Sequence, residues 1–277
     1  SLDETIRDFQ LLCFDKDGYF IGRRKVTFSK SLESDGDYVL SGSIPSPTCR
    51  IHFVANGNFS SFNDTESMGV SENVLIPSLN SSMEDTQMTY WGYKSFPTSD
   101  EMFNFLNSGT NTIYLLRDRA EITVDNETSD IQSVDFTVCN SLEYGTLAPF
   151  DKNHLDAPFA YDDSVGVKYV TEPEDQSKCP IPSVFPNTPS KYVFEEPNSS
   201  SDPLFVILKV TYKGISMPVY YKILLENAEF NMLPIIRNHE YRIVIKKLAM
   251  ALGYGSFSEA LNGDAANDPF LYVDDII

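Results

Sequence analysis

The chain has 277 residues, a formal net charge of −19 at pH 7 and 42% hydrophobic residues, including 19 Phe and 15 Tyr. The length exceeds that of a usual single domain and predicts two cores of roughly 130 residues each, and the aromatic content excludes wholesale disorder. The acidic charge repels phosphate backbones and anionic lipid heads, so we expect no nucleic acid among its partners and no electrostatic membrane binding. Because no run of about 18 apolar residues and no basic-then-apolar leader occur, we expect no membrane insertion by this chain; an export leader would lie upstream and have been removed.

The first segments in chain order have the pattern of β-hairpins. FQLLCFD and YFIGRRKVTF flank the turn Lys16–Gly18, where Asp-Gly supplies the positive φ of a tight turn. DYVLSGSIP and CRIHFVANG follow, and the second of these ends in an Asn-Gly-Asn turn. The sequence therefore predicts a β-meander at the N-terminus.

Residues 58–111 interrupt this pattern with a Ser- and Asn-rich insert. One helix is expected from Ser99 to Asn107, with Ser99 as a candidate cap and Met102, Phe103 and Leu106 on one face. The only tryptophan of the chain lies in this insert, in Tyr90-Trp91-Gly92-Tyr93. A lone Trp in a β-protein usually anchors a core or a loop, and the alternative is that Tyr90, Trp91 and Tyr93 stack on a sugar ring.

Strands resume at NTIYLLRDRAEITVD and DIQSVDFTVCN, and a polar stretch from 145 to 197 follows. Five prolines between Glu172 and Ser190 exclude a helix or a central strand there. PLFVILKVTY, ISMPVYYKILL and EYRIVIKKLAM are then expected to form an antiparallel set, in which Tyr241, Ile243 and Ile245 face the core. The predicted fold is all-β, with two tandem antiparallel β-sandwiches of transthyretin or immunoglobulin type, over residues 1–149 and 150–277, and a long loop and helix insert in the first.

No pattern indicates catalysis, a cofactor or a metal centre. The three histidines lack an i, i+4 partner, and His239-Glu240 is followed by Ile243 where a second zinc ligand would stand. Asp15–Gly18 resembles the start of a calcium loop but is followed by Tyr19 and Ile21, so a hairpin turn is favoured. GxSxG, P-loop and GxGxxG motifs are absent, and the four cysteines are too far apart for a zinc or redox motif. We therefore expect a protein that is not an enzyme, with isolated buried cysteines or an unassigned disulfide.

Several segments, in this order, resemble the fimbrillin family of Bacteroidetes, the subunits of type V pili. The segments are LLCFDKDGYFI, CRIHFVANG, LLRDRAEITV, YVFEE, VYYKILL and RNHEYRIVI. The resemblance covers most of the chain. It implies two β-sandwich domains, export as a lipoprotein with its lipid anchor upstream, and location in a fimbrium at the cell surface and outer membrane.

The resemblance also implies how such a chain acts. In the family, a protease removes an upstream plug strand and a neighbouring subunit donates a strand in its place, which is β-augmentation. Arg7, Arg23 and Arg24 are the candidate cleavage sites, although the last two are favoured as part of a folded hairpin. Asp163-Ser164-Val165 resembles the O-glycosylation signal of these bacteria, with Ser164 as acceptor.

The expected function is a structural or adhesive fimbrial subunit whose partners are other fimbrial subunits and a host protein or glycan. The alternative is a surface glycan-binding lipoprotein module. The segment Phe270–Ile277 is either a donor strand or an edge strand of its own domain. Stalk, tip and anchor roles stay open.

Overall fold

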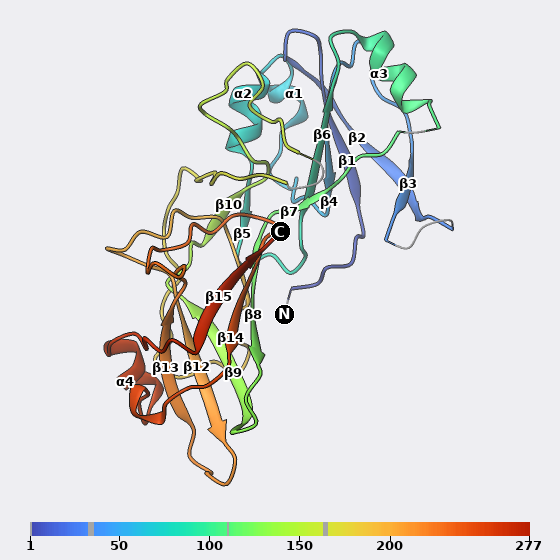
Figure 1. Cartoon of the computed structure of the whole chain (residues 1–277). Helices are drawn as coiled ribbons and strands as arrows, with labels where there is room; N and C mark the ends of the chain where they lie inside the picture. Colours follow the sequence, from blue (N-terminus) through green and yellow to red (C-terminus); the bar gives the residue numbers. More distant parts are fainter. Residues whose placement is uncertain (1, 33–35, 110, 163–165) are drawn as a thin grey trace. The chain divides into compact units, whose positions relative to one another are not determined.

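The computed structural model describes residues 2–32, 36–109, 111–162 and 166–277 (Figure 1). Strands dominate, and helices are few and short. The expected all-β class is confirmed. Two compact units are present: an N-terminal unit of Leu2–Asp118 with Thr146–Val167, and a C-terminal unit of Arg119–Gly145 with Lys168–Ile277.

The division between the units differs from the predicted boundary near Pro149. Strands β8 (Ala120–Asn126) and β9 (Ile131–Cys139) pair with strands from the end of the chain rather than with the N-terminal meander. The stretch that contains Pro149 returns to the N-terminal unit. Local hydrophobic patterns identify β8 and β9 as strands but contain no information about their distant partners. That the two units fold as independent domains stays a prediction.

The N-terminal unit is built on a six-stranded sheet of order β3-β2-β1-β4-β6-β7. Its strands are β1 (Phe9–Phe14), β2 (Phe20–Lys30), β3 (Tyr38–Ser41), β4 (Arg50–Ala55), β6 (Tyr90–Ser95) and β7 (Leu116–Arg117). The pairings between neighbouring strands of this sheet are antiparallel among the described residues. The hairpin between β1 and β2 turns at Gly18, whose φ of 81° favours glycine, and Asp15 Oδ1 accepts the N–H groups of Asp17 and Tyr19.

Short helices cover both faces of this sheet. On one face, α3 (Ser99–Leu106) inserts the buried Met102 into a core with Cys13, Ile51 and Phe53. Thr98, and not Ser99 as predicted, caps α3 by accepting the Glu101 N–H. Toward the other face lie α1 (Asp64–Ser67) and α2 (Glu72–Leu75), as Figure 1 shows. The 3₁₀ helix η1 (Ile76–Ser78) follows α2 directly in the chain. The N-terminal unit also contains the three-residue strand β5 (Asn80–Ser82). The three-residue strand β10 (Tyr144–Thr146) lies where the chain passes from the C-terminal unit back to the N-terminal one.

The C-terminal unit is a sandwich of two sheets, of order β11-β8-β14-β15 and β13-β12-β9. The remaining strands are β11 (Tyr192–Val193), β12 (Phe205–Tyr212), β13 (Val219–Leu224), β14 (Glu240–Ile245) and β15 (Leu271–Ile276). One core of apolar side chains from both sheets joins them, and Tyr241, Ile243 and Ile245 are buried in it as predicted. β15 is an edge strand of this sheet, which is one of the two alternatives for Phe270–Ile277.

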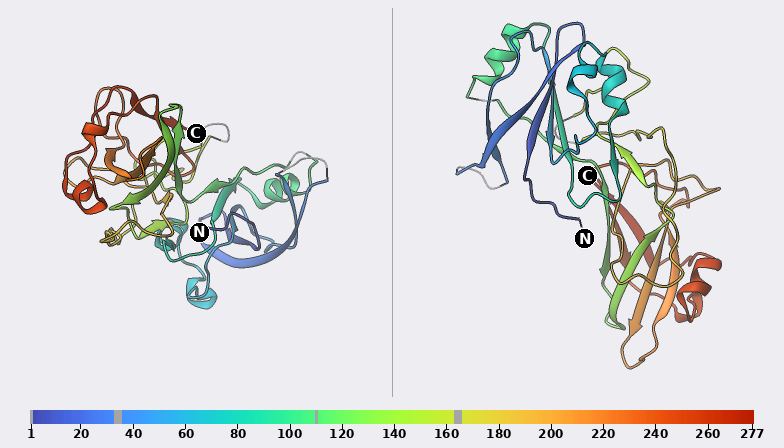
Figure 2. Two further views of the ribbon diagram at one scale, coloured as in Figure 1. Left: turned by 90° about the horizontal axis from the view of Figure 1, so that it is seen from below. Right: turned by 180° about the vertical axis from the view of Figure 1, so that it is seen from behind.

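The predicted antiparallel set of the three C-terminal segments is wrong in one part. β12 and β13 are antiparallel neighbours, but β14 lies in the other sheet and pairs with β8 in parallel. η2 (Met250–Leu252) and α4 (Phe257–Asn262) follow β14. Phe257 and Ala260 of α4 pack against Phe205 and Ile207 on the outer face of the β12 sheet, where both views of Figure 2 place the helix.

Candidate functional site

A buried polar cluster of the N-terminal unit surrounds His52 on β4. His52 has no exposed surface, because β4 is a central strand and its neighbours Phe14 and Phe159 pack against the imidazole ring. The indole Nε1–H of Trp91 donates to His52 Nδ1 at 2.9 Å. An indole is only a donor, so Nδ1 is the acceptor and the proton of the neutral ring lies on Nε2.

Glu72 completes this cluster from the helix α2. His52 Nε2 donates to Glu72 Oε2 at 2.8 Å, and Arg50 donates to Glu72 Oε1 at 2.9 Å. Burial lowers the pKa of His52 below its ordinary value of 6.5, despite the neighbouring carboxylate. Burial raises the pKa of Glu72, but the hydrogen bonds from His52 and Arg50 and the positive charge of Arg50 oppose this effect, and the net pKa is lowered.

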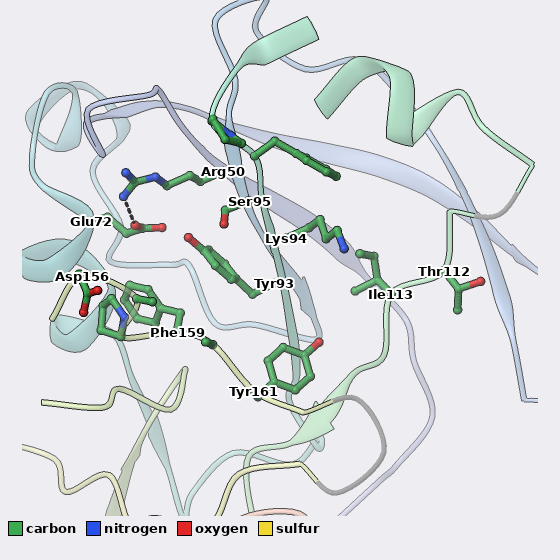
Figure 3. Close-up of a pocket in the computed structure, with 15 residues that line it drawn as sticks. Arg50, Glu72, Tyr93, Lys94, Ser95, Thr112, Ile113, Asp156, Phe159 and Tyr161 are labelled. Atoms are coloured by element: carbon green, nitrogen blue, oxygen red, sulfur yellow. Dashed lines mark hydrogen bonds and ion pairs between the residues drawn. The ribbon is translucent and has the colours of Figure 1, made fainter. Parts of the chain in front are cut away.

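A cavity of about 440 Å³ opens beside this cluster. Its walls come from the end of β6, from residues 112–113 and from the returning segment 156–161. Figure 3 shows the Tyr93 ring extending from β6 toward Glu72 and Phe159, with Tyr161 further along the wall. The rings of Tyr93 and Phe159 have centroids 5.6 Å apart, so the wall is aromatic where it meets the buried Glu72.

The same cavity lies along an open edge of β6. Among the described residues, β6 pairs with β4 over its whole length but with β7 only at Tyr90 and Trp91. Phe96 N donates to Cys49 O in the β4 register, and alternate residues of an antiparallel strand point their backbone groups to opposite sides. The N–H and C=O groups of Tyr93 and Ser95 therefore point away from β4, toward the side that β7 leaves free.

The structure separates the three predicted sugar-stacking residues. Trp91 and Tyr93 share a face of β6, with ring planes 10° apart, but Trp91 has no exposed surface. Tyr90 is on the opposite face, against the α3 core, and its hydroxyl donates to Glu4 O at 2.7 Å. Tyr93 alone of the three lines the cavity. A glycan contact by these residues stays a prediction.

The three candidate cleavage sites lie in different environments. Arg7 precedes β1, has a side chain 61% exposed and pairs with Asp3 at 3.0 Å. Arg23 and Arg24 lie within β2 and pair with Leu12 and Leu11 of β1. Arg23 also donates to both carboxylate oxygens of Asp64, at 3.0 and 2.8 Å. Ser164, the predicted glycosylation site, lies outside the described residues.

Sequence reasoning missed Arg50 and Glu72 as partners of His52. Glu72 is 20 positions from His52 in a polar insert, and no local spacing relates the two residues. The described residues contain no group of three side chains suited to holding a metal ion. A search of the same residues finds no helix with the length and apolar character needed to cross a membrane.

Comparison with known proteins gives a consistent result. No protein-family model matches the chain. The sequence is 27% identical over 290 aligned positions to the major fimbrium tip subunit FimE of Porphyromonas gingivalis, an alignment that covers 97% of this chain. The chain spans about half, 48%, of the length of that relative.

Solved structures with the same fold include a candidate cell adhesion protein and a tip fimbrial protein. A candidate cell adhesion protein from Bacteroides eggerthii aligns with a TM-score of 0.53 at 15% identity, over 99% of this chain and 90% of that one. The tip fimbrial protein Mfa3 of P. gingivalis, truncated at its C-terminus, aligns with a TM-score of 0.54 at 14% identity, over 99% and 94%.

By its fold and by these matches, the chain resembles the β-rich fimbrial and adhesion proteins of Bacteroidetes, as the sequence segments predict. Its relatives by sequence include FimE, a fimbrium tip subunit.

Proposed function

We propose that this chain is a structural or adhesive subunit of a bacterial cell-surface fimbria of type V, without enzymatic activity, and that it assembles by donor-strand exchange. The relatedness to a fimbrium tip subunit supports the fimbrial role. Its partners are then other fimbrial subunits, with a host protein or glycan as a further candidate. Its location is the fimbrium at the outer membrane, reached through a lipoprotein signal upstream of the chain.

One observation supports strand exchange in particular, namely the open edge of β6. Tyr93 and Ser95 offer backbone donors and acceptors to an added strand, and no strand of the described residues uses them. An incoming extended segment gains main-chain hydrogen bonds from such an edge, and pockets beside it accept alternate side chains. The cavity lined by Tyr93, Phe159 and Tyr161 lies in the right place to receive such side chains.

Ser95 allows a sharp test, because its N–H faces the open edge and not β4. Proline at this position removes the N–H that an added strand needs while leaving the β4–β6 hydrogen bonds in place. We propose to trim the full precursor with trypsin and to compare the parent, Ser95→Ala and Ser95→Pro on unheated denaturing gels and by electron microscopy. A ladder of detergent-resistant bands with filaments is expected for the parent and for Ser95→Ala, and a marked loss of the ladder for Ser95→Pro.

Two outcomes would contradict the proposal in different ways. A trimmed parent that stays monomeric would argue against polymerisation by strand exchange and favour a tip or anchor role. Equal ladders from Ser95→Pro and Ser95→Ala would leave polymerisation intact and move the acceptor edge away from β6. Circular dichroism of each monomer separates these results from misfolding.

The second candidate function is glycan binding at the same cavity, because its wall presents Tyr93 and Phe159 beside a polar cluster. A Tyr93→Ala protein that keeps its fold and loses sugar binding would favour this alternative. Unchanged sugar binding, or none in the parent, would argue against it.

A further inference from the structure

A second cavity of about 460 Å³ lies in the insert between β4 and β6, apart from the β6 edge. It is lined by residues from three stretches of this insert, 57–70, 75–81 and Thr89, together with Leu147. Its volume is within the range of about 300–1,000 Å³ that is usual for small-molecule sites. It shares no lining residue with the cavity beside β6.

The chemistry of the lining is polar and nearly free of charge. Nine of its sixteen residues carry a polar side chain, and eight of these nine are uncharged amides or hydroxyls. Glu66 is the one charged residue, and no Lys, Arg or His is among the lining residues. Phosphates and carboxylates are recognised by fixed cations, so this lining disfavours an anionic ligand. Amides and hydroxyls instead suit a neutral ligand that carries several hydroxyl groups.

Several of these polar groups have unused hydrogen-bonding capacity. Asn58 Oδ1 accepts from Ser60, and Asn63 Oδ1 accepts the Glu66 N–H. Both residues are exposed, and neither Nδ2 amino group has a hydrogen-bond partner among the described residues. The Ser81 hydroxyl also has no hydrogen bond to a described residue, although Ser81 is only 6% exposed. The cavity therefore combines fixed amide carbonyls with donors that are still available.

Contacts between Phe59, Phe62 and Arg23 hold the apolar part of the lining in place. Phe59 and Phe62 pack edge to face with centroids 5.7 Å apart. The Arg23 guanidinium lies 5.1 Å and 5.2 Å from these two ring centroids, and Asp64 fixes it through two hydrogen bonds. Gly57 allows the chain to fold back over Phe59, because a Cβ at that position would lie 2.6 Å from a Phe59 ring atom and from a Val54 methyl carbon. Such prior ordering lowers the entropic cost of binding a ligand.

We propose that this cavity, with Asn58, Asn63 and Ser81 as hydrogen-bonding groups and Phe59 and Phe62 as its apolar wall, is a binding site for a neutral saccharide unit. Aromatic rings pack against the C–H faces of a sugar, and amide and hydroxyl groups pair with its hydroxyls. This site differs from the Tyr93 cavity in its residues. It does not depend on strand exchange, because none of its residues lies on the open edge of β6.

The test measures binding of the folded full chain to a panel of neutral and acidic mono- and disaccharides by saturation-transfer NMR. Asn58→Asp with Asn63→Asp is the informative variant, because each carboxylate keeps the acceptor oxygen that orders the loop and removes the Nδ2 donors. Asn153→Asp is the matched control, since Asn153 is exposed in the same unit and lies outside both cavities. We expect at least one neutral saccharide to bind, at least a tenfold weakening in the double variant, and no change in the control.

Three results would overturn the proposal. One is that no neutral saccharide binds, and another is that only acidic saccharides bind. The third is that binding survives Asn58→Asp with Asn63→Asp but is lost in Tyr93→Ala, which would place the sugar in the cavity beside β6. The double variant must unfold at the same temperature as the parent, so that a loss of binding reports on the site and not on the fold.

Discussion

The Trp91 indole donates a hydrogen bond to His52 Nδ1 at 2.9 Å, and neither side chain has exposed surface. This bond fixes the neutral tautomer of His52, which in turn directs the Nε2 proton to Glu72. The lone tryptophan of the chain is thus a packing and hydrogen-bonding residue, and the strand β6 that carries it is tied to β4 and α2 through side chains as well as through the backbone.

Trp91→Phe is expected to destabilise the N-terminal unit. The change leaves the buried His52 Nδ1 without a donor, which costs about 1–3 kcal/mol, and it also removes buried apolar surface. Urea unfolding followed by circular dichroism measures the loss, because the variant has no tryptophan fluorescence. In a His52→Phe background the same change should cost less, with a coupling free energy of about 0.5–3 kcal/mol between the two sites. Strictly additive costs would contradict the importance of the bond.

The stability of the N-terminal unit is expected to fall as the pH falls below about 6.5. The pKa of His52 is lowered in the folded state, so the unfolded chain takes up the proton first and gains free energy from it. The stabilisation is complete above the ordinary value of 6.5 and is lost progressively as the pH falls toward the lower pKa of the folded state. Glu72, whose pKa is also lowered, acts in the same direction below its ordinary value of 4.5.

Urea midpoints between pH 8 and pH 5.5 measure this dependence. His52→Gln should flatten it. Parallel pH profiles for the parent and His52→Gln would show that another group is responsible.

Ile243→Ala is expected to destabilise the C-terminal unit by about 2–5 kcal/mol, because Ile243 has no exposed surface and its truncation leaves a cavity between the two sheets. Arg242→Ala is the control. Arg242 precedes Ile243 on the same strand, its side chain is 42% exposed, and a surface change of this kind usually costs less than about 0.5 kcal/mol. Denaturant unfolding compares the two. A cost for Ile243→Ala below about 1 kcal/mol would mean that the inward face of β14 is misassigned.

An arginine-specific protease is expected to cut the native chain after Arg7 before it cuts after Arg23 or Arg24. Arg7 lies outside the strands, whereas the backbone of the other two is paired with β1 and the Arg23 side chain is held by Asp64. Cleavage needs a segment released from its backbone hydrogen bonds. At Arg7 these are the bond from the Arg7 N–H to Asn56 Oδ1 and the bond from the Asn56 N–H to Asp8 O, and not a strand pairing. Mass spectrometry of a time course identifies the first product, and Arg7→Gln should abolish it. Early appearance of a fragment beginning at Arg24 would contradict this order.

Features that depend on residues close together in the sequence are predicted correctly, whereas features that depend on residues far apart in the sequence are not. The β1–β2 hairpin follows from Asp-Gly between two apolar runs, and the inward face of β14 follows from the alternation of Tyr241, Ile243 and Ile245, so both are predicted correctly. The helix α3 is predicted with its cap one residue too late, which is a usual error at helix ends.

The sheet partners could not be predicted in the same way. β14 has the pattern of a strand, but nothing in its residues distinguishes pairing with β8 from pairing with β13. The candidate sites follow the same logic. The buried cluster depends on Glu72 of the insert meeting His52 of β4, and the saccharide cavity depends on three separate stretches of the insert closing over Phe59, so neither has a local spacing that could reveal it.

The parallel pairing of β8 with β14 has a consequence for the order in which the C-terminal unit is made. The edge of β8 at Glu121 can form its strand pairing only after Glu240 of β14 has been synthesised. Most of this unit therefore leaves the ribosome before its sheet can close. Such long-range pairing slows folding and leaves strand edges exposed to misassembly in the meantime. A nascent chain that ends before residue 240 therefore has β8 and its two-residue neighbour β11 but lacks β14, which pairs with the other edge of β8.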